Sequence, residues 1–210
     1  MNIASAIIEA LIIIAVVLLS LSVHEFAHAW VANLFGDPTA RLEGRMTINP
    51  IKHWDNIGTT LLVCLIFLNT LGLGLPVFGW GKPVPIDERN FSNPRWHGFQ
   101  AAIAGPMSNL IFAIIISVIV RSAHLSIDSV LGSAFYFAIY INIFLMFFNL
   151  IPVPPLDGSR VLRLVLPEET YFVITGNPMV SLGILLVIFF FLITPIANWS
   201  QQLALFLLNR

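Results

Sequence analysis

The sequence predicts an all-α membrane protein that crosses the bilayer several times. Of its 210 residues, 58% are hydrophobic and 10% are charged, whereas a soluble domain carries about 25% charged residues. Several apolar runs are also long enough to cross a hydrocarbon layer about 30 Å thick. We therefore expect one integral-membrane domain over residues 1–210. It should form a bundle of about 4–5 transmembrane helices, with a small β-hairpin and a re-entrant segment near the functional site.

The charge and the cysteine content exclude several kinds of function. The formal net charge is −1 at pH 7, so the chain has no overall basic field that would attract nucleic acid. The single cysteine, Cys64, excludes an internal disulfide and a cysteine-rich metal site. We expect the lipid bilayer, and no nucleic acid, among the partners of the chain.

The first expected helix covers residues 4–35 and ends at a Gly-Asp-Pro sequence. Its apolar run has no positively charged start, and no small-residue cleavage site follows it. We therefore expect a retained membrane helix rather than a removed signal peptide. Residues 39–49 then alternate between apolar and polar side chains, which predicts a short β-hairpin or paired strand at the membrane face.

The second apolar run is interrupted by glycines and a proline. Only residues 58–71, about 14 positions, precede these breakers, whereas a full crossing needs about 20 residues. We therefore expect a re-entrant segment over residues 58–78. Longer apolar runs predict three further helices, at residues 96–120, 130–150 and 179–194.

A His-Glu-x-x-His motif lies inside the first apolar run. In a helix, His24 and His28 lie one turn apart on the same face, where two imidazoles can bind one zinc ion. Glu25 stands beside them and can take a proton from a zinc-bound water. A charged side chain at the centre of a membrane helix costs roughly 2.5–3.5 kcal/mol. A metal site explains this cost better than a chance match in which the histidines pair with neighbours.

Catalytic zinc sites usually have three protein ligands, so a further ligand is needed. Asp157 lies between a proline-rich stretch and the expected start of a short amphipathic helix. Its carboxylate could reach back into the bundle, or it could cap the helix that follows. The residues alone leave both interpretations open.

Four segments together resemble the site-2 protease family of intramembrane zinc metalloproteases. They read H-E-F-A-H, A-G-P-M-S-N, G-K-P-V-P-I-D and N-L-I-P-V-P-P-L-D-G in chain order. The resemblance covers nearly the whole chain and is greatest to short forms without PDZ or CBS domains. It implies an intramembrane protease that hydrolyses peptide bonds within or near the transmembrane segments of membrane proteins.

The resemblance also implies roles for individual residues. His24, His28 and Asp157 would be the ligands of one Zn²⁺ per chain, and Glu25 would be the general base. Asn149 matches the polar asparagine proposed to bind the substrate carbonyl or the oxyanion. His53 stands outside these motifs and is either a near-site partner or an ordinary interfacial histidine.

Two other functions are alternatives to the protease. A di-iron membrane hydroxylase needs several histidine boxes, whereas only two of the five histidines here share a motif. A membrane metal or ion carrier could line its path with these side chains, but it would need neither the proline-rich Leu-Asp-Gly element nor an oxyanion donor. One tight zinc per chain would favour the protease.

The re-entrant segment also decides the expected topology. If residues 58–78 crossed the membrane, Asp157 would emerge about 20–30 Å from the histidines, far beyond a zinc–ligand distance of about 2 Å. A returning segment brings Asp157 to the histidine side, together with eight of the ten Lys and Arg residues. The positive-inside rule assigns that side to the cytoplasm. We therefore expect a multi-pass protein of the cell membrane, with its active site open to the cytoplasm and its N-terminus outside.

Overall fold

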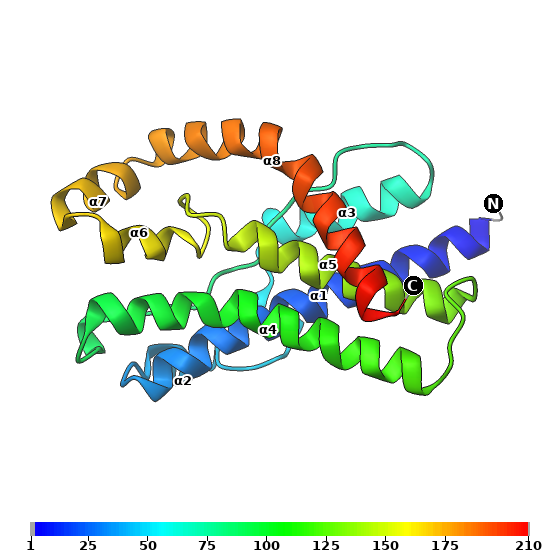
Figure 1. Cartoon of the computed structure of the whole chain (residues 1–210), viewed down its shortest axis with the longest axis horizontal. Helices are drawn as coiled ribbons and strands as arrows, with labels where there is room; N and C mark the ends of the chain where they lie inside the picture. Colours follow the sequence, from blue (N-terminus) through cyan, green and yellow to red (C-terminus); the bar gives the residue numbers. More distant parts are fainter. Residues whose placement is uncertain (1–2, 210) are drawn as a thin grey trace.

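The computed structural model describes residues 3–209, without the side chains of residues 3–5, 130, 178 and 182. This part of the chain is helical and contains no strand. Figure 1 shows an elongated bundle built on four long helices, which are α1 (Ile3–Leu34), α4 (Pro94–Ser122), α5 (Val130–Asn149) and α8 (Pro178–Leu207). Each contains an apolar stretch long enough to cross a membrane. The shorter elements are α2 (Thr39–Leu42), η1 (Pro50–His53), α3 (Gly58–Thr70), η2 (Glu88–Asn90), α6 (Ser159–Val165) and α7 (Glu168–Thr175).

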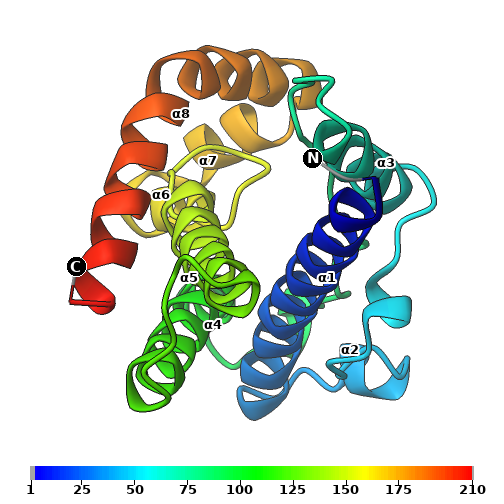
Figure 2. The same cartoon turned by 90° about the vertical axis from the view of Figure 1, so that its right-hand side faces the viewer.

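The last long helix extends well beyond the expected range of 179–194. It continues through Pro195 to Leu207, and it bends markedly partway along (Figures 1 and 2). Proline removes one backbone hydrogen bond and crowds the preceding turn, so it bends an apolar helix without ending it. Helix α7 was not anticipated from the sequence.

The predicted β-hairpin at residues 39–49 is wrong. The segment begins with helix α2 and continues in turns, because its backbone donors bond to nearby carbonyls instead of a partner strand. Arg45 N and Met46 N both donate to Ala40 O, at 2.8 and 3.2 Å. Gly44 adopts a φ of +64°, a left-handed conformation that ends the short helix. The alternating pattern does not mark a buried face, because Leu42 and Ile48 are exposed and the buried residues are Ala40 and Arg45.

The segment at residues 58–78 contains helix α3 and an extended return. Its two ends lie together, because Lys82 N donates to His53 O at 2.8 Å and Thr59 Oγ1 donates to Trp80 O at 3.1 Å. The fold does not itself establish the expected re-entrant segment. These contacts fix where the ends lie, and the depth of the segment in a membrane stays a prediction.

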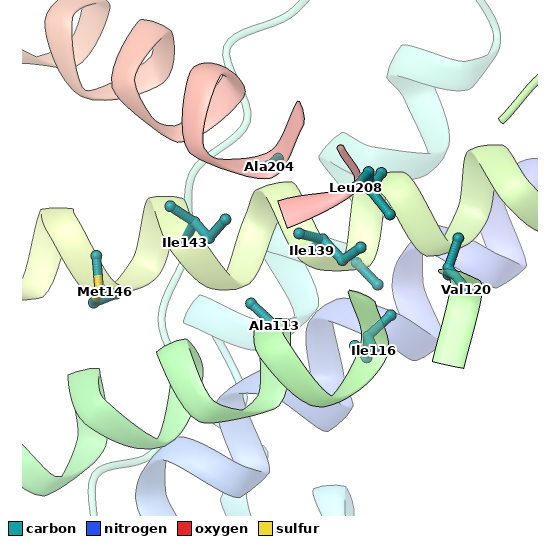
Figure 3. Close-up of a cluster of buried hydrophobic side chains, with 9 residues drawn as sticks. Ala113, Ile116, Val120, Ile139, Ile143, Met146, Ala204 and Leu208 are labelled. Atoms are coloured by element: carbon teal, nitrogen blue, oxygen red, sulfur yellow. The ribbon is translucent and has the colours of Figure 1, made fainter. Parts of the chain in front are cut away.

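The main core joins α4, α5 and the C-terminal part of α8 (Figure 3). Ala113 and Ala204 are fully buried there and let the helices approach Ile139 and Ile143 closely. A smaller cluster packs α3 against α1. With α5 held beside α4 and α1, the turn after α5 reaches the middle of the bundle, where the site lies.

One end of the bundle gathers the C-terminus of α1, the N-terminus of α4 and helix α6. The rings of Phe35 and His97 stack there with centroids 4.4 Å apart. Arg95 Nε donates to Arg163 O at 2.6 Å, which joins the start of α4 to α6. Helix α6 therefore lies against the start of α4 and next to α7, at the left of Figure 1.

Candidate metal centre and active site

Helix α1 presents His24 and His28 toward α4, and both histidines are only 6% exposed. Their Nε2 atoms lie 2.9 Å apart. Asp157 Oδ2 lies 3.0 Å from the Nε2 of His24 and 3.3 Å from that of His28. In residues 3–209 these three side chains form the one group of His, Cys, Asp or Glu residues that could hold a metal ion. The structure thus brings together the three residues expected as ligands.

The hydrogen bonds of the two imidazoles turn their Nε2 atoms toward each other and toward Asp157 Oδ2. His28 Nδ1 lies 2.8 Å from Ala101 O, and a carbonyl can only accept, so this nitrogen carries the proton. His24 Nδ1 lies 2.6 Å from Asn109 Oδ1 in the same way. In the neutral form of each ring Nε2 is then the unprotonated nitrogen, as zinc ligation requires.

The three ligand atoms surround a position that suits a cation. Two nitrogen lone pairs and a carboxylate oxygen repel one another unless a positive charge lies among them. Asp157 Oδ2 is also buried without a hydrogen-bond partner in the described structure. Two histidine nitrogens and one carboxylate oxygen form a common donor set of catalytic zinc sites, so these residues fit zinc.

A tight turn after α5 returns Asp157 to α1. Gly158 N donates to Asn149 O at 2.7 Å, which closes the turn directly beyond the helix. A Cβ on Gly158 would lie 2.3 Å from Leu150 O, so only glycine allows this close return. The Leu-Asp-Gly sequence therefore has a structural reason beside its chemical one.

Helix α4 approaches the histidine rings at Gly105. A Cβ there would lie 2.3 Å from His28 Nε2 and 2.7 Å from His24 Cε1. The missing side chain opens the space in which the ligand atoms meet. This contact explains the glycine of the Ala-Gly-Pro segment, whose purpose the sequence does not reveal.

Glu25 is held beside the ligands by an extended segment that precedes α4. Val84 N donates to Glu25 Oε2 at 2.8 Å. Arg45 anchors this segment, because its guanidinium donates to Lys82 O at 2.8 Å and to Pro83 O at 3.2 Å. Neither Arg45 nor Val84 was singled out from the sequence, since a backbone donor and its support carry no sequence signature.

His53 contacts the extended segment at Lys82. Its Nε2 lies 2.7 Å from Thr47 O, and its side chain is buried. Its carbonyl accepts the hydrogen bond from Lys82 N. His53 does not belong to the group that could hold a metal, and its role near the site stays a prediction.

Asn149 ends helix α5, where its side-chain Nδ2 donates to Leu145 O at 3.1 Å. This is a bond within one helix, and the amide is half-buried. No hydrogen bond in the described part of the chain joins this side chain to the three expected ligands. Its expected contact with substrate stays a prediction.

Two carboxylates at the same end of the bundle tie the segment before α4 in place. Asp37 accepts from Asp87 N and from Asn90 Nδ2, both at 2.8 Å. Burial alone would raise the pKa of Asp37, but these bonds and those from Thr39 outweigh it and hold the pKa below its usual value. Hydrogen bonds from Arg89 lower the pKa of the exposed Asp87 to about 2.

Comparisons with known proteins show the family of the chain. The family model described as "Peptidase family M50" matches residues 12–126 and 123–193. A Bacillus subtilis protein named "Putative zinc metalloprotease YwhC" is 35% identical over 194 residues, which cover 89% of this chain and 82% of that protein.

A second relative comes from Mycolicibacterium smegmatis and is named "Putative zinc metalloprotease Rip2". It is 31% identical over 195 residues, which cover 92% of this chain and 71% of that protein. No solved structure matches the chain. The family match spans far more than half of the sequence and includes the histidine motif and the Leu-Asp-Gly turn. The chain therefore belongs to peptidase family M50, the site-2 protease family, and is an intramembrane zinc metalloprotease.

Proposed function

We propose that the chain hydrolyses peptide bonds in transmembrane proteins at one zinc ion held by His24, His28 and Asp157. The observation that carries the proposal is the meeting of two imidazole Nε2 atoms and a carboxylate oxygen within 4.8 Å of one another. The two rings are fixed from behind by Ala101 O and Asn109 Oδ1. Such support from outside the ligand set is typical of functional metal sites.

Glu25 acts as the general base in this proposal. Zinc bound at the three ligands would polarise a peptide carbonyl and lower the pKa of a bound water toward about 7. The bond from Val84 N holds one oxygen of Glu25 and leaves the other able to accept a proton. Glu25 then passes this proton to the leaving amine, so that one carboxylate serves as base and acid in turn.

Asn149 donates a hydrogen bond to the substrate carbonyl as negative charge develops on it. Its position supports this role, because Gly158 N bonds to its carbonyl and so ties Asn149 to the turn that carries Asp157. Its side chain would exchange the bond to Leu145 O for one to the substrate.

An apolar cavity of about 730 Å³ supports access from within the membrane. It is lined by α1, α3, α5 and α8 and by the return at residues 76–79. Its lining includes Leu21 and Leu145, each one helical turn before Glu25 and Asn149 respectively. An apolar cavity that ends beside the proposed site fits a transmembrane segment better than a soluble peptide. Transmembrane proteins are therefore the proposed substrates.

The expected topology is part of the same proposal. The segment at residues 58–78 enters the membrane and returns, because His53 and Lys82 lie bonded to each other at its two ends. Its extended part lines the apolar cavity, where irregular backbone can be tolerated at membrane depth. The site then faces the cytoplasm, and the N-terminus lies outside the cell membrane. The basic residues on the site side are Arg41, Arg45, Lys52, Lys82, Arg89, Arg95, Arg160 and Arg163.

Cleavage in proteoliposomes tests the proposal. Wild type and Glu25→Gln are reconstituted with a panel of single-span proteins, and products and bound zinc are measured together. We expect Glu25→Gln to keep its zinc and to lose at least roughly 10²–10⁴-fold in rate. The exposed Glu43→Gln is the matched control and should cleave like wild type. Near-normal turnover by zinc-loaded Glu25→Gln would remove Glu25 from the mechanism.

A further inference from the structure

Three fully buried polar side chains connect α1, α4 and α5 beside the histidines. Ser20, Asn109 and Asn142 are each 0% exposed. Asn142 Nδ2 donates to Ser20 Oγ at 2.8 Å, and Asn109 Nδ2 donates to Asn142 Oδ1 at 2.8 Å. Asn109 Oδ1 then lies 2.6 Å from His24 Nδ1. The three side chains form a continuous relay that ends on one of the proposed zinc ligands.

The donor and the acceptor of every hydrogen bond in the relay follow from Ser20, the residue at the end away from His24. Ser20 Oγ donates its one proton to Val16 O at 2.8 Å, so it must accept from Asn142. The second amide proton of Asn142 goes to Ala138 O at 2.8 Å, and a carbonyl can only accept. Ser20 Oγ and Ala138 O therefore both accept from the amino group of Asn142 and hold it facing them. Its amide oxygen therefore faces Asn109.

The same reasoning continues to His24. Because Asn142 offers an oxygen, Asn109 must turn its amino group toward it and its own oxygen toward the imidazole. His24 Nδ1 then carries the proton, and the Nε2 lone pair points at Asp157 and His28. His28 is set directly by a backbone carbonyl, Ala101 O. His24 has no such carbonyl partner and takes its orientation from the relay instead.

We propose that Asn142 and Ser20 are positioning residues for the metal, which act on His24 through Asn109. They fix the tautomer and the ring orientation of His24 before a metal binds. Asn142 is the second side chain of the relay counted from His24, and Ser20 is the third. The inference rests on the proposed role of His24 as a zinc ligand. The plain alternative is that these residues only join helices through buried hydrogen bonds, as polar side chains in membrane bundles do.

Zinc affinity separates the two readings. The purified full-length protein competes for zinc with a chelator of known affinity, and the visible spectrum of the Co²⁺ form reports the ligand geometry. Asn142→Ala should raise the zinc Kd by about 10–100-fold, the loss typical of partners outside the ligand set. Ser20→Ala should raise the Kd in the same direction by less, because Asn142 keeps its bond to Ala138 O. Ser20→Thr keeps the hydroxyl and should restore wild-type affinity.

Ser200→Ala is the matched control. Ser200 is also 0% exposed and donates to a carbonyl four residues earlier, Ile196 O, at 2.7 Å. It takes no part in the relay, so its loss should cost stability without changing zinc affinity. The proposal is overturned if Ser20→Ala and Asn142→Ala bind zinc with the wild-type Kd and the wild-type Co²⁺ spectrum. If Asn142→Ala does not fold, the three serine variants decide the question. A wild-type protein that binds no zinc would instead contradict the proposed function.

Discussion

His24 and His28 face each other through their Nε2 atoms, which lie 2.9 Å apart. Each ring uses its one proton at Nδ1, on Asn109 Oδ1 and on Ala101 O. The rings are therefore prepared for a cation before it arrives. Because both stand on one rigid helix, little rearrangement is needed when zinc binds.

Gly105→Ala should weaken zinc binding by crowding the rings. The new methyl group would lie 2.3 Å from His28 Nε2, which real side chains do not tolerate, so α4 or the imidazole must move. We expect a loss of zinc affinity of about tenfold or more, similar to the loss of a partner that orients a ligand. Chelator competition measures it.

Gly98→Ala in the same helix is the control for this substitution. Its Cβ would meet Glu88 Oε1 at 3.4 Å, an ordinary contact. Equal zinc affinity in the two variants would show that the close approach at Gly105 is not needed.

Glu88→Gln should loosen α6, which directly follows Asp157. The Glu88 carboxylate pairs with both Arg160 and Arg163, and Arg163 is only 13% exposed. Losing the charge leaves that guanidinium with its ion pair to the exposed Glu168, so we expect the free energy of unfolding in detergent to fall by about 1–3 kcal/mol. Thermal unfolding followed by circular dichroism measures the change.

Arg89→Ala is the matched control for the ion pairs. The Arg89 side chain is 89% exposed, and within residues 3–209 its one ion pair is with Asp87, two residues earlier. Exposed pairs contribute little, so the unfolding temperature should not change. A larger loss for Arg89→Ala than for Glu88→Gln would contradict the assignment of stability to the half-buried pairs of Glu88.

Asp37→Asn should destabilise the protein at neutral pH and have little effect in acid. The hydrogen bonds from Thr39, Asn90 and Asp87 N lower the pKa of Asp37 below its usual 3.8. A lowered pKa gives stability that is present above the usual value and is lost as the pH falls through the folded value. The difference between wild type and variant should therefore be full at pH 7, shrink as the pH falls below 3.8 and disappear below the folded pKa of Asp37.

Unfolding temperatures measured across this pH range test the prediction. Asp128→Asn, in the exposed loop before α5, serves as the control and should match wild type at every pH. A stability gap for Asp37→Asn that stays constant from pH 7 to pH 3 would mean that its ionisation does not contribute.

The three expected zinc ligands could be predicted better from the sequence than the conformation of residues 39–49. The spacing of His24 and His28 specifies one helix face, so the motif alone predicts their meeting. The resemblance to a known family supplied Asp157, because a carboxylate after a proline-rich turn is equally well read as a helix cap. The structure places its oxygen 3.0 Å from His24 Nε2.

Other features depend on contacts between distant segments. Residues 39–49 alternate like a strand, but no partner strand reaches them, and their donors bond to Ala40 O instead. Asn109 and Asn142 could be recognised as polar groups needing partners, yet nothing in the sequence links them to His24. Pro195 predicts either a kink or an end of the last helix, and the structure shows that the helix continues through it.

The zinc content of the purified protein tests the central claim most directly. Elemental analysis of wild type, His24→Ala, Asp157→Ala and His97→Ala should be made after equal zinc loading and washing. We predict one zinc per chain in wild type and in His97→Ala, whose ring stacks on Phe35 away from the ligands. His24→Ala should hold almost none, and Asp157→Ala much less than one. Full zinc occupancy in Asp157→Ala together with full proteolytic activity would contradict the proposed site.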